Sequence, residues 1–183
     1  MADTYRPTTI DVPLKGSILI ITDQDYNDTE LFYPLYRFVE EGFEVTVASL
    51  NGGEVKGYNS APLKVTVPVG RVNPAEYDAL YLPGGRAPAK LRENEQVLGI
   101  VKYFYEAEKP IAAICHGPQI LASAGLLNGK EVTAWPGIEA EMREAGAIFR
   151  NVPVVESWNL ITARMPGDLP AHLHAFLIMI ERQ

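Results

Sequence analysis

Cys115 is the only cysteine in the chain, and its neighbours are arranged as a reactive thiol requires. The apolar run at residues 111–114 ends at this cysteine, and a small turn leads into an apolar segment that resembles a helix. A strand that ends at a nucleophile and turns directly into a helix is a nucleophile elbow, which aims helix N–H groups at the side chain. This setting predicts a low thiol pKa and a thiolate at neutral pH. The alternative is an inert cysteine that packs as a small hydrophobe.

Two backbone amides are candidates for an oxyanion hole beside this thiol. The amide that follows the nucleophile, here that of His116, usually faces the developing charge in an elbow. Gly84 and Gly85 follow another predicted strand, and a glycine amide there could approach the substrate closely; a plain turn is the alternative. The His116 imidazole could act in acid–base chemistry or only form the pocket wall, because neighbouring side chains on a turn often diverge.

Glu30 is a carboxyl group within an otherwise apolar run near the start of a predicted helix. Burial would raise its pKa and keep it protonated, and a protonated carboxyl can donate a hydrogen bond to a thiolate. The alternative is a first-turn glutamate that only interacts with the helix dipole. Spacing alone does not decide between these readings.

The two histidines near the C-terminus do not form a metal site by their spacing. His172 and His174 are two residues apart and face different sides of a predicted helix, whereas a helical metal pair needs a spacing of three or four. We therefore expect surface or packing roles for them and no metal or other cofactor. The chain also lacks the downstream His-x-Glu pair with which class I glutamine amidotransferases complete a cysteine elbow.

The elements that must position these residues alternate between strands and helices. Strands are predicted at residues 17–22, 43–49, 79–82 and 111–114, with further short strands toward the C-terminus. Helices are predicted at 29–41, with Asp28 as its cap, at 94–107, after the elbow, and at 167–181. This alternation predicts an α/β fold, a three-layer α/β/α sandwich with a mostly parallel sheet. Glu30, Gly85 and Cys115 would then meet at the carboxyl ends of the strands.

Composition limits the class of protein. The 183 residues are 47% hydrophobic and 21% charged, as in one ordinary globular domain. A net charge of −7 argues against nucleic-acid partners, because phosphate contacts need clustered Lys and Arg.

A lone cysteine suits the reducing cytoplasm. The N-terminus lacks the pattern of a signal peptide, and no apolar run is long enough to span a membrane. We therefore expect a cytoplasmic protein.

Four stretches of sequence resemble the motifs of one family. They are ELFYP at 30–34, LPGGRAP at 82–88, AICHGPQ at 113–119 and RxPxDL at 164–169. Together they closely resemble the PfpI family, the protease-like and glyoxalase-like branch of the superfamily that contains the parkinsonism protein DJ-one. The resemblance implies one flavodoxin-like domain over residues 17–183, preceded by an N-terminal extension at 1–16, and assembly into a homodimer or homohexamer.

The resemblance also implies roles for individual residues. Cys115 would be the nucleophile with His116 beside it, and Glu30 would be the carboxyl that hydrogen-bonds the sulfur. The amides of Gly85 and His116 would form the oxyanion hole, with Gly84 in the pocket. Activities in the family include peptidase, glutathione-independent glyoxalase, a debated deglycase and chaperone-like holding.

Three positions depart from the archaeal proteases of this family. Ala89 stands where those proteins have a glutamate that reaches the catalytic histidine of a neighbouring subunit. Asn27 stands at an acidic position near the pocket mouth, and Trp135 at a position often held by Tyr. The protease triad is therefore incomplete, and the pocket entrance is altered in polarity and shape.

Three functions follow from these residues as alternatives. In the first, the Cys115 thiolate acts on small carbonyl substrates, as a glyoxalase or deglycase does. In the second, Cys115 takes part in acyl transfer as a hydrolase or peptidase. In the third, Cys115 is oxidised in a redox-sensing or chaperone-like protein without turnover. Ala89 weakens the peptidase reading, and we rank an enzyme acting on small carbonyl compounds first.

Overall fold

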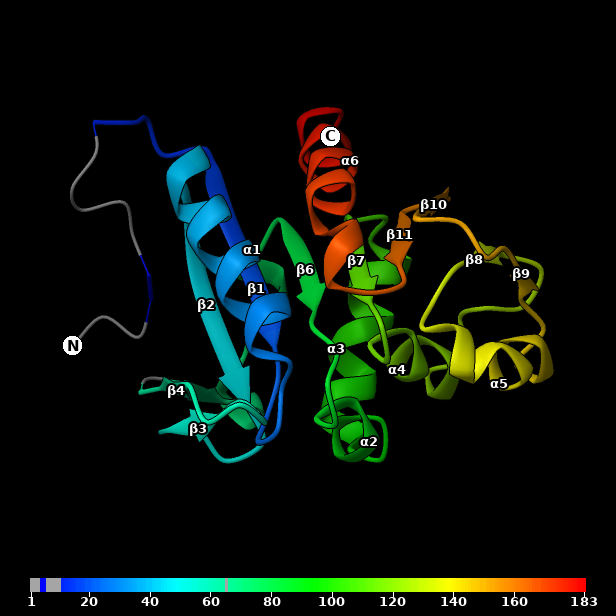
Figure 1. Ribbon diagram of the computed structural model, residues 1–183. Helices are drawn as coiled ribbons and strands as arrows, with labels where there is room; N and C mark the ends of the chain where they lie inside the picture. The colour runs from blue at the N-terminus through cyan, green and yellow to red at the C-terminus, as the bar shows by residue number, and fades with distance from the viewer. Residues whose placement is uncertain (1–3, 6–10, 65) are drawn as a thin grey trace.

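The computed structural model describes residues 4, 5, 11–64 and 66–183 (Figure 1). Its central sheet has the strand order β10–β11–β7–β6–β1–β2–β5. From one edge to the other these strands are Val154–Ser157, Leu160–Ala163, Ile111–Ile114, Ala79–Leu82, Gly16–Ile21, Phe43–Ser49 and Val67–Pro68. All neighbours pair in parallel except β10, which runs antiparallel to β11 at the edge. The predicted parallel sheet is confirmed.

Helices cover both faces of this sheet. The first face carries α1 (Asp28–Glu41), which packs on β2, and α6 (Leu169–Glu181), which packs on β7 and β11 (Figure 1). The other face carries α3 (Glu95–Glu106) and the short helix α4 (Pro118–Ser123), with α2 (Pro88–Leu91) and α5 (Glu139–Glu144) beside α4. The result is the predicted flavodoxin-like three-layer sandwich.

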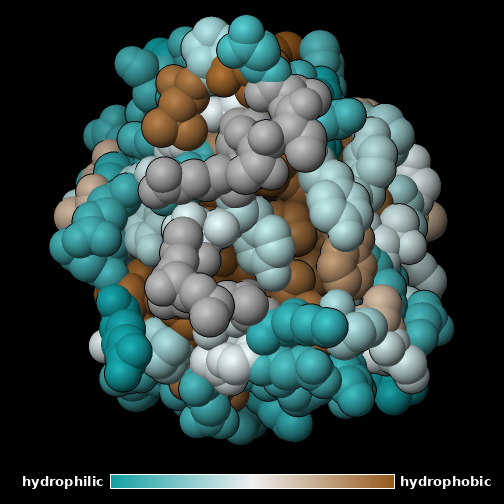
Figure 2. Space-filling model, turned by 90° about the vertical axis from the view of Figure 1, so that its left-hand side faces the viewer, coloured by the Kyte–Doolittle hydropathy of each residue, from teal (hydrophilic) through white to brown (hydrophobic). Residues whose placement is uncertain are grey.

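Two small strand pairs lie outside the central sheet. The hairpin of β3 (Val55–Lys56) and β4 (Pro62–Leu63) is antiparallel, whereas β8 (Glu131–Val132) pairs in parallel with β9 (Ile148–Phe149). On the side of the molecule that carries β2 and this hairpin, hydrophobic residues are visible between hydrophilic ones (Figure 2). Tyr5, from the predicted N-terminal extension, forms an antiparallel bridge with Val45 of β2; most of residues 1–10 lies outside the described residues.

The strands are hydrophobic along their whole length because both faces of the sheet are covered. In β6 and β7 every residue is buried. Phe38 of α1 lies in this core and is fully buried, 5.5 Å from the ring of Tyr81 and 5.7 Å from that of Phe176. The sequence alone suggests that Tyr33, Tyr36 and Phe38 are all exposed. This is wrong for Phe38, whereas Tyr33 and Tyr36 are 42% and 61% exposed.

The start of α1 differs from the prediction in its cap. Asn27, rather than Asp28, is the N-cap, and its side-chain oxygen accepts a hydrogen bond from the Glu30 amide at 3.1 Å. Asp28 instead accepts hydrogen bonds from the amides of Asn59 and Ala61, each at 3.0 Å. The cap fixes the first turn of α1, and with it the backbone of Glu30.

None of the helices in the described part of the chain has both the length and the hydrophobicity that a membrane-spanning helix needs.

Candidate active site

Cys115 occupies a strained turn between β7 and α4. Its φ is 61°, in the left-handed region that residues other than glycine rarely adopt, and its amide is tied to the Ala163 carbonyl at 3.0 Å. The chain can turn this sharply only because residue 117 is a glycine. A Cβ at Gly117 would lie 2.5 Å from the Leu82 carbonyl oxygen. This is the predicted elbow, and it leaves the thiol 8% exposed at the base of a pocket.

The side chain of Glu30 reaches the thiol from the first turn of α1. It is fully buried, and its Oε2 accepts a hydrogen bond from the Gly84 amide at 3.0 Å. Its Oε1 has no nitrogen or oxygen partner among the described residues. The direct interaction of this carboxyl with the Cys115 side chain shifts the pKa of both groups. Three elements, α1, the loop after β6 and the elbow, therefore converge on the sulfur.

Burial raises the pKa of both members of this pair. The pKa of Glu30 rises to about 7 because the carboxyl is desolvated, with the Gly84 amide and the thiol opposing the shift. The pKa of Cys115 rises to about 12, first because of burial and then because of the Glu30 charge. The low thiol pKa expected from the elbow is therefore wrong in direction. Burial and a neighbouring carboxylate outweigh the helix end, which belongs to a helix of only six residues.

Two amides oppose this shift and face the sulfur. Hydrogen bonds from the backbone N–H groups of Gly85 and His116 lower the pKa of Cys115. Gly85 has a φ of 86°, and a Cβ there would lie 2.6 Å from the Tyr26 carbonyl carbon, so this position requires glycine. These are the two amides predicted for the oxyanion hole. Donors that already point at the sulfur can also stabilise an oxygen formed on the atom bonded to it.

The His116 imidazole lies against the thiol instead of diverging from it. Its Nδ1 is 3.3 Å from Cys115 Sγ, and its ring stacks on Trp135 with centroids 6.4 Å apart. Burial lowers the pKa of His116, while the negative charge of Glu141 raises it. At neutral pH the ring is thus a neutral group within hydrogen-bonding distance of the sulfur.

Glu141 is a functional candidate that sequence reasoning missed. Ala89, at the position of the family glutamate, is exposed on α2 and brings no carboxylate to His116. Glu141 of α5 supplies a negative charge within the same chain, and it is held by Arg92 and by the Gln119 side chain, whose Nε2 donates to it at 2.8 Å. Its sequence position, on a short helix far from the motifs, carried no signal for this role.

The pocket above the thiol has a volume of about 290 Å³. It brings together the predicted residues Asn27, Gly85, Cys115, His116 and Trp135 with two residues that were not predicted as site residues, Tyr58 and Arg86. Gly84 does not line it but lies below, where a Cβ would come within 2.7 Å of Cys115 Cβ. Tyr58 comes from the turn of the β3–β4 hairpin, a Gly- and Asn-rich segment whose sequence gave no sign of a site.

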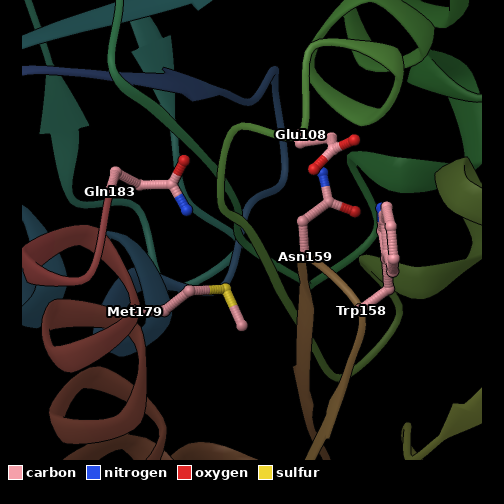
Figure 3. A pocket seen from close by; sticks show the side chains of 5 residues that line it. All are labelled: Glu108, Trp158, Asn159, Met179 and Gln183. Carbon is pink, nitrogen blue, oxygen red and sulfur yellow. The ribbon is translucent and has the colours of Figure 1, made fainter.

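A second pocket lies at the opposite end of the sheet (Figure 3). Its residues are Glu108, Trp158, Asn159, Met179 and Gln183. It lies at the amino end of β7, where the Ile111 amide donates to the Asn159 carbonyl at 2.8 Å. The Asn159 side chain donates to the Lys109 carbonyl at 2.8 Å and thus serves the turn before β7. No cysteine, serine or histidine is among these five residues, so this pocket is not the candidate active site.

His172 and His174 play the structural roles expected of them. His172 is fully buried and donates from Nε2 to the Ile161 carbonyl at 3.1 Å, while His174 is exposed. No group of three or more His, Cys, Asp or Glu side chains that could hold a metal ion occurs in the described part of the chain.

Comparison with known proteins places this geometry in a family. The DJ-1/PfpI family matches residues 16–179. Deglycase PfpI of Pyrococcus furiosus is 42% identical over 164 residues, which cover 90% of this chain and 99% of that protein. Protein/nucleic acid deglycase 2 of Escherichia coli is 39% identical over 160 residues, covering 86% and 92%. The crystal structure of Drosophila melanogaster DJ-1beta has a TM-score of 0.82 at 28% identity, covering 91% of this chain and 89% of that one. The chain therefore belongs to the DJ-1/PfpI family.

Proposed function

We propose that the protein is a Cys115-dependent enzyme that converts small 2-oxoaldehydes to hydroxy acids. The observation that carries the proposal is the buried Glu30 carboxyl beside the thiol, with its pKa raised to about 7. A general base works best when its pKa is near the ambient pH. Glu30 can therefore take the thiol proton during attack, so the free enzyme does not need a standing thiolate.

The first step is addition of the thiol to the aldehyde. A bond forms between Sγ and the aldehyde carbon, the thiol proton passes to Glu30, and the carbonyl π electrons move to oxygen. The amides of Gly85 and His116 stabilise this oxyanion. Glu30 then gives this proton to the oxyanion, which yields a neutral hemithioacetal.

The second step moves hydrogen within the adduct. The Glu30 carboxylate removes the proton from the carbon bonded to sulfur, and the electron pair forms a double bond to the neighbouring carbon, whose carbonyl oxygen becomes the oxyanion of an enediolate. Glu30 returns this proton to the second carbon, and the hydroxyl proton on the first carbon passes to the oxygen of the second, which gives a hydroxy thioester. Water then attacks the thioester, the C–S bond breaks, and the thiol regains its proton. The net change is addition of one water, with no external oxidant or reductant.

Peptide hydrolysis makes a demand that this pocket meets poorly. An amine leaving group must be protonated, which requires a histidine cation. Burial lowers the pKa of His116 by more than the Glu141 charge raises it, and Ala89 stands at the position of the acid that the family's proteases use. An aldehyde has no leaving group and makes no such demand. Redox sensing is also disfavoured, because oxidation proceeds through the thiolate and the pKa of Cys115 is raised.

The test is a turnover assay on methylglyoxal beside a panel of unactivated peptides. We expect lactate formation by the wild-type protein, loss of that activity in Cys115→Ala, and little peptide cleavage by either. Glu30→Gln should bind the aldehyde as a hemithioacetal, detectable by mass spectrometry, but form lactate at least about 100-fold more slowly because the base is missing. Cys115-dependent peptide cleavage without methylglyoxal consumption would overturn the proposal.

A further inference from the structure

Arg86 lines the mouth of the Cys115 pocket, and no acidic side chain of the described residues pairs with it. Its side chain is exposed, and no ion pair or side-chain hydrogen bond to it occurs within residues 4, 5, 11–64 and 66–183. By contrast, Arg92 and Arg164 are paired with Glu141 and Asp168. A guanidinium left free at the rim of a pocket, in a chain of net charge −7, is available to a ligand.

The backbone around Arg86 is fixed on both sides, so the position of the cation is defined by the fold. Its amide donates to the Asp25 carbonyl at 2.9 Å, and the preceding residue, Gly85, bridges Tyr26. The next residue, Ala87, is fully buried at the start of α2. Only the side chain of Arg86 is free to adjust, and it does so at the rim of the pocket.

Tyr58 presents a second donor at the same rim. Asn27 Nδ2 donates to the Tyr58 hydroxyl oxygen at 2.7 Å, which leaves the phenolic hydrogen for another acceptor. Burial, followed by the charges of Glu30, Cys115 and Asp28, raises the pKa of Tyr58, and the positive charge of Arg86 opposes this rise. Asp28 is already engaged with the amides of Asn59 and Ala61 and does not neutralise Arg86.

We propose that Arg86 and the Tyr58 hydroxyl bind an anionic group of the substrate, a carboxylate or phosphate, in the pocket whose base holds Cys115. The inference rests on the proposed function and narrows its substrate class to anionic 2-oxoaldehydes. A guanidinium donates planar, charge-assisted hydrogen bonds and a phenolic hydroxyl can donate one more, so together they suit such a group. Because Arg86 is exposed and Cys115 is buried, the charge sits at the mouth while the aldehyde reaches the thiol.

Two alkylating probes test this site without relying on turnover. Iodoacetate and iodoacetamide are nearly equal in size and both form a bond from Sγ to carbon with loss of iodide, but only iodoacetate is an anion. We expect Arg86→Gln to lower the ratio of the iodoacetate to the iodoacetamide rate at Cys115 by about 5- to 10-fold. Arg86→Lys should retain part of the ratio, because it keeps the charge but not the planar guanidinium.

Lys90→Gln is the matched control. Lys90 is an exposed cation on α2 that does not line the pocket, and its removal changes the net charge equally. It should leave the ratio at the wild-type value. Equal ratios in Arg86→Gln and Lys90→Gln would overturn the inference.

Protection of Cys115 from iodoacetamide by acetate or by inorganic phosphate identifies the anion, and protection by neither also counts against the site. If the ratio of alkylation rates depends on Arg86 but the protein turns over neither methylglyoxal nor a 2-oxoaldehyde that carries a carboxylate or phosphate, the anion site is retained and the proposed function is rejected. If the protein turns over the aldehyde but the ratio of alkylation rates does not depend on Arg86, the proposed function is retained and the anion site is rejected.

Discussion

The Gly84 amide donates a hydrogen bond to Glu30 Oε2 at 3.0 Å, and this contact joins the loop after β6 to the first turn of α1 directly beneath the nucleophile. It supports a buried carboxyl that would otherwise be costly in this position. The same bond limits how far the pKa of Glu30 rises, since it favours the ionised form.

Replacement of Gly84 by alanine should damage both stability and activity. The new Cβ would overlap Glu30 Oε2 and lie 2.7 Å from Cys115 Cβ, so the carboxyl must move. We expect a loss of about 1–3 kcal/mol in the free energy of unfolding, measured by urea denaturation, and loss of turnover. Gly99→Ala is the control, because a Cβ on that exposed face of α3 meets no atom within 4 Å and should stabilise the helix. Equal behaviour of the two variants would contradict this account.

Removal of the Glu30 charge should lower the pKa of the Cys115 thiol. The negative carboxylate is the second-largest cause of the raised thiol pKa, after burial. In Glu30→Gln we expect alkylation of Cys115 at pH 8 to be about tenfold faster, as a shift of one pKa unit implies. The measurement is the alkylation rate against pH. Glu40→Gln, which removes an exposed charge from the same helix, should titrate as the wild-type protein does.

Glu30 and His172 should impose opposite pH dependences on stability. The pKa of Glu30 is raised from 4.5 to about 7, so the folded protein binds more protons than the unfolded chain in this window and stability falls as pH rises. Burial lowers the pKa of His172 from 6.5 to about 4, so stability falls as pH drops through that window. Between pH 4.5 and 6.5 the two contributions largely cancel.

Glu30→Gln should reveal the effect of His172 on the pH dependence of stability, because it removes the opposing effect of Glu30. Its free energy of unfolding should rise by about 2–3 kcal/mol from pH 4.5 to 6.5, relative to the change in the wild-type protein over the same range. Urea denaturation at several pH values measures this difference. Parallel curves for the two proteins would mean that Glu30 does not keep its proton on folding.

Glu141 should tune the protonation of His116. Because its charge raises the pKa of His116, Glu141→Gln should lower that pKa further. The measurement is an NMR titration of the imidazole protons, with the His116 signal assigned from its absence in His116→Asn. Glu139→Gln removes a carboxylate from the same helix, one paired with Arg143, and should leave the His116 titration unchanged. A His116 pKa unaffected by either change would remove Glu141 from the site.

The protein should form at least a dimer. Tyr33 and Tyr36 remain exposed on α1, 42% and 61% respectively, and an exposed aromatic pair is typical of an interface. Light scattering should report an oligomer at micromolar concentration, and Tyr36→Arg should weaken it. A monomeric wild-type protein would contradict the expectation.

Local patterns predicted the parallel sheet and the elbow because each depends on neighbouring residues. The strand run at 111–114 and the glycine and proline that follow His116 carry that information themselves. The ionisation of Cys115 could not be predicted in the same way. It depends on how deeply the thiol is buried and on Glu30, which is distant in the chain. Tyr58 and Glu141 were missed for a similar reason, since a hairpin turn and a short helix bring them to the site only in the folded chain.

Because its pKa is raised in the folded protein, Cys115 is protected there from reactions that proceed through the thiolate. In an unfolded chain the same thiol would return to an ordinary pKa of about 8.5 and meet oxidants and electrophiles as a thiolate far more often. Copies that unfold in a stressed cell would therefore be modified first, and a bulky adduct at the elbow would prevent them from refolding. Mass-spectrometric scoring of the single cysteine would then record the unfolding history of the population.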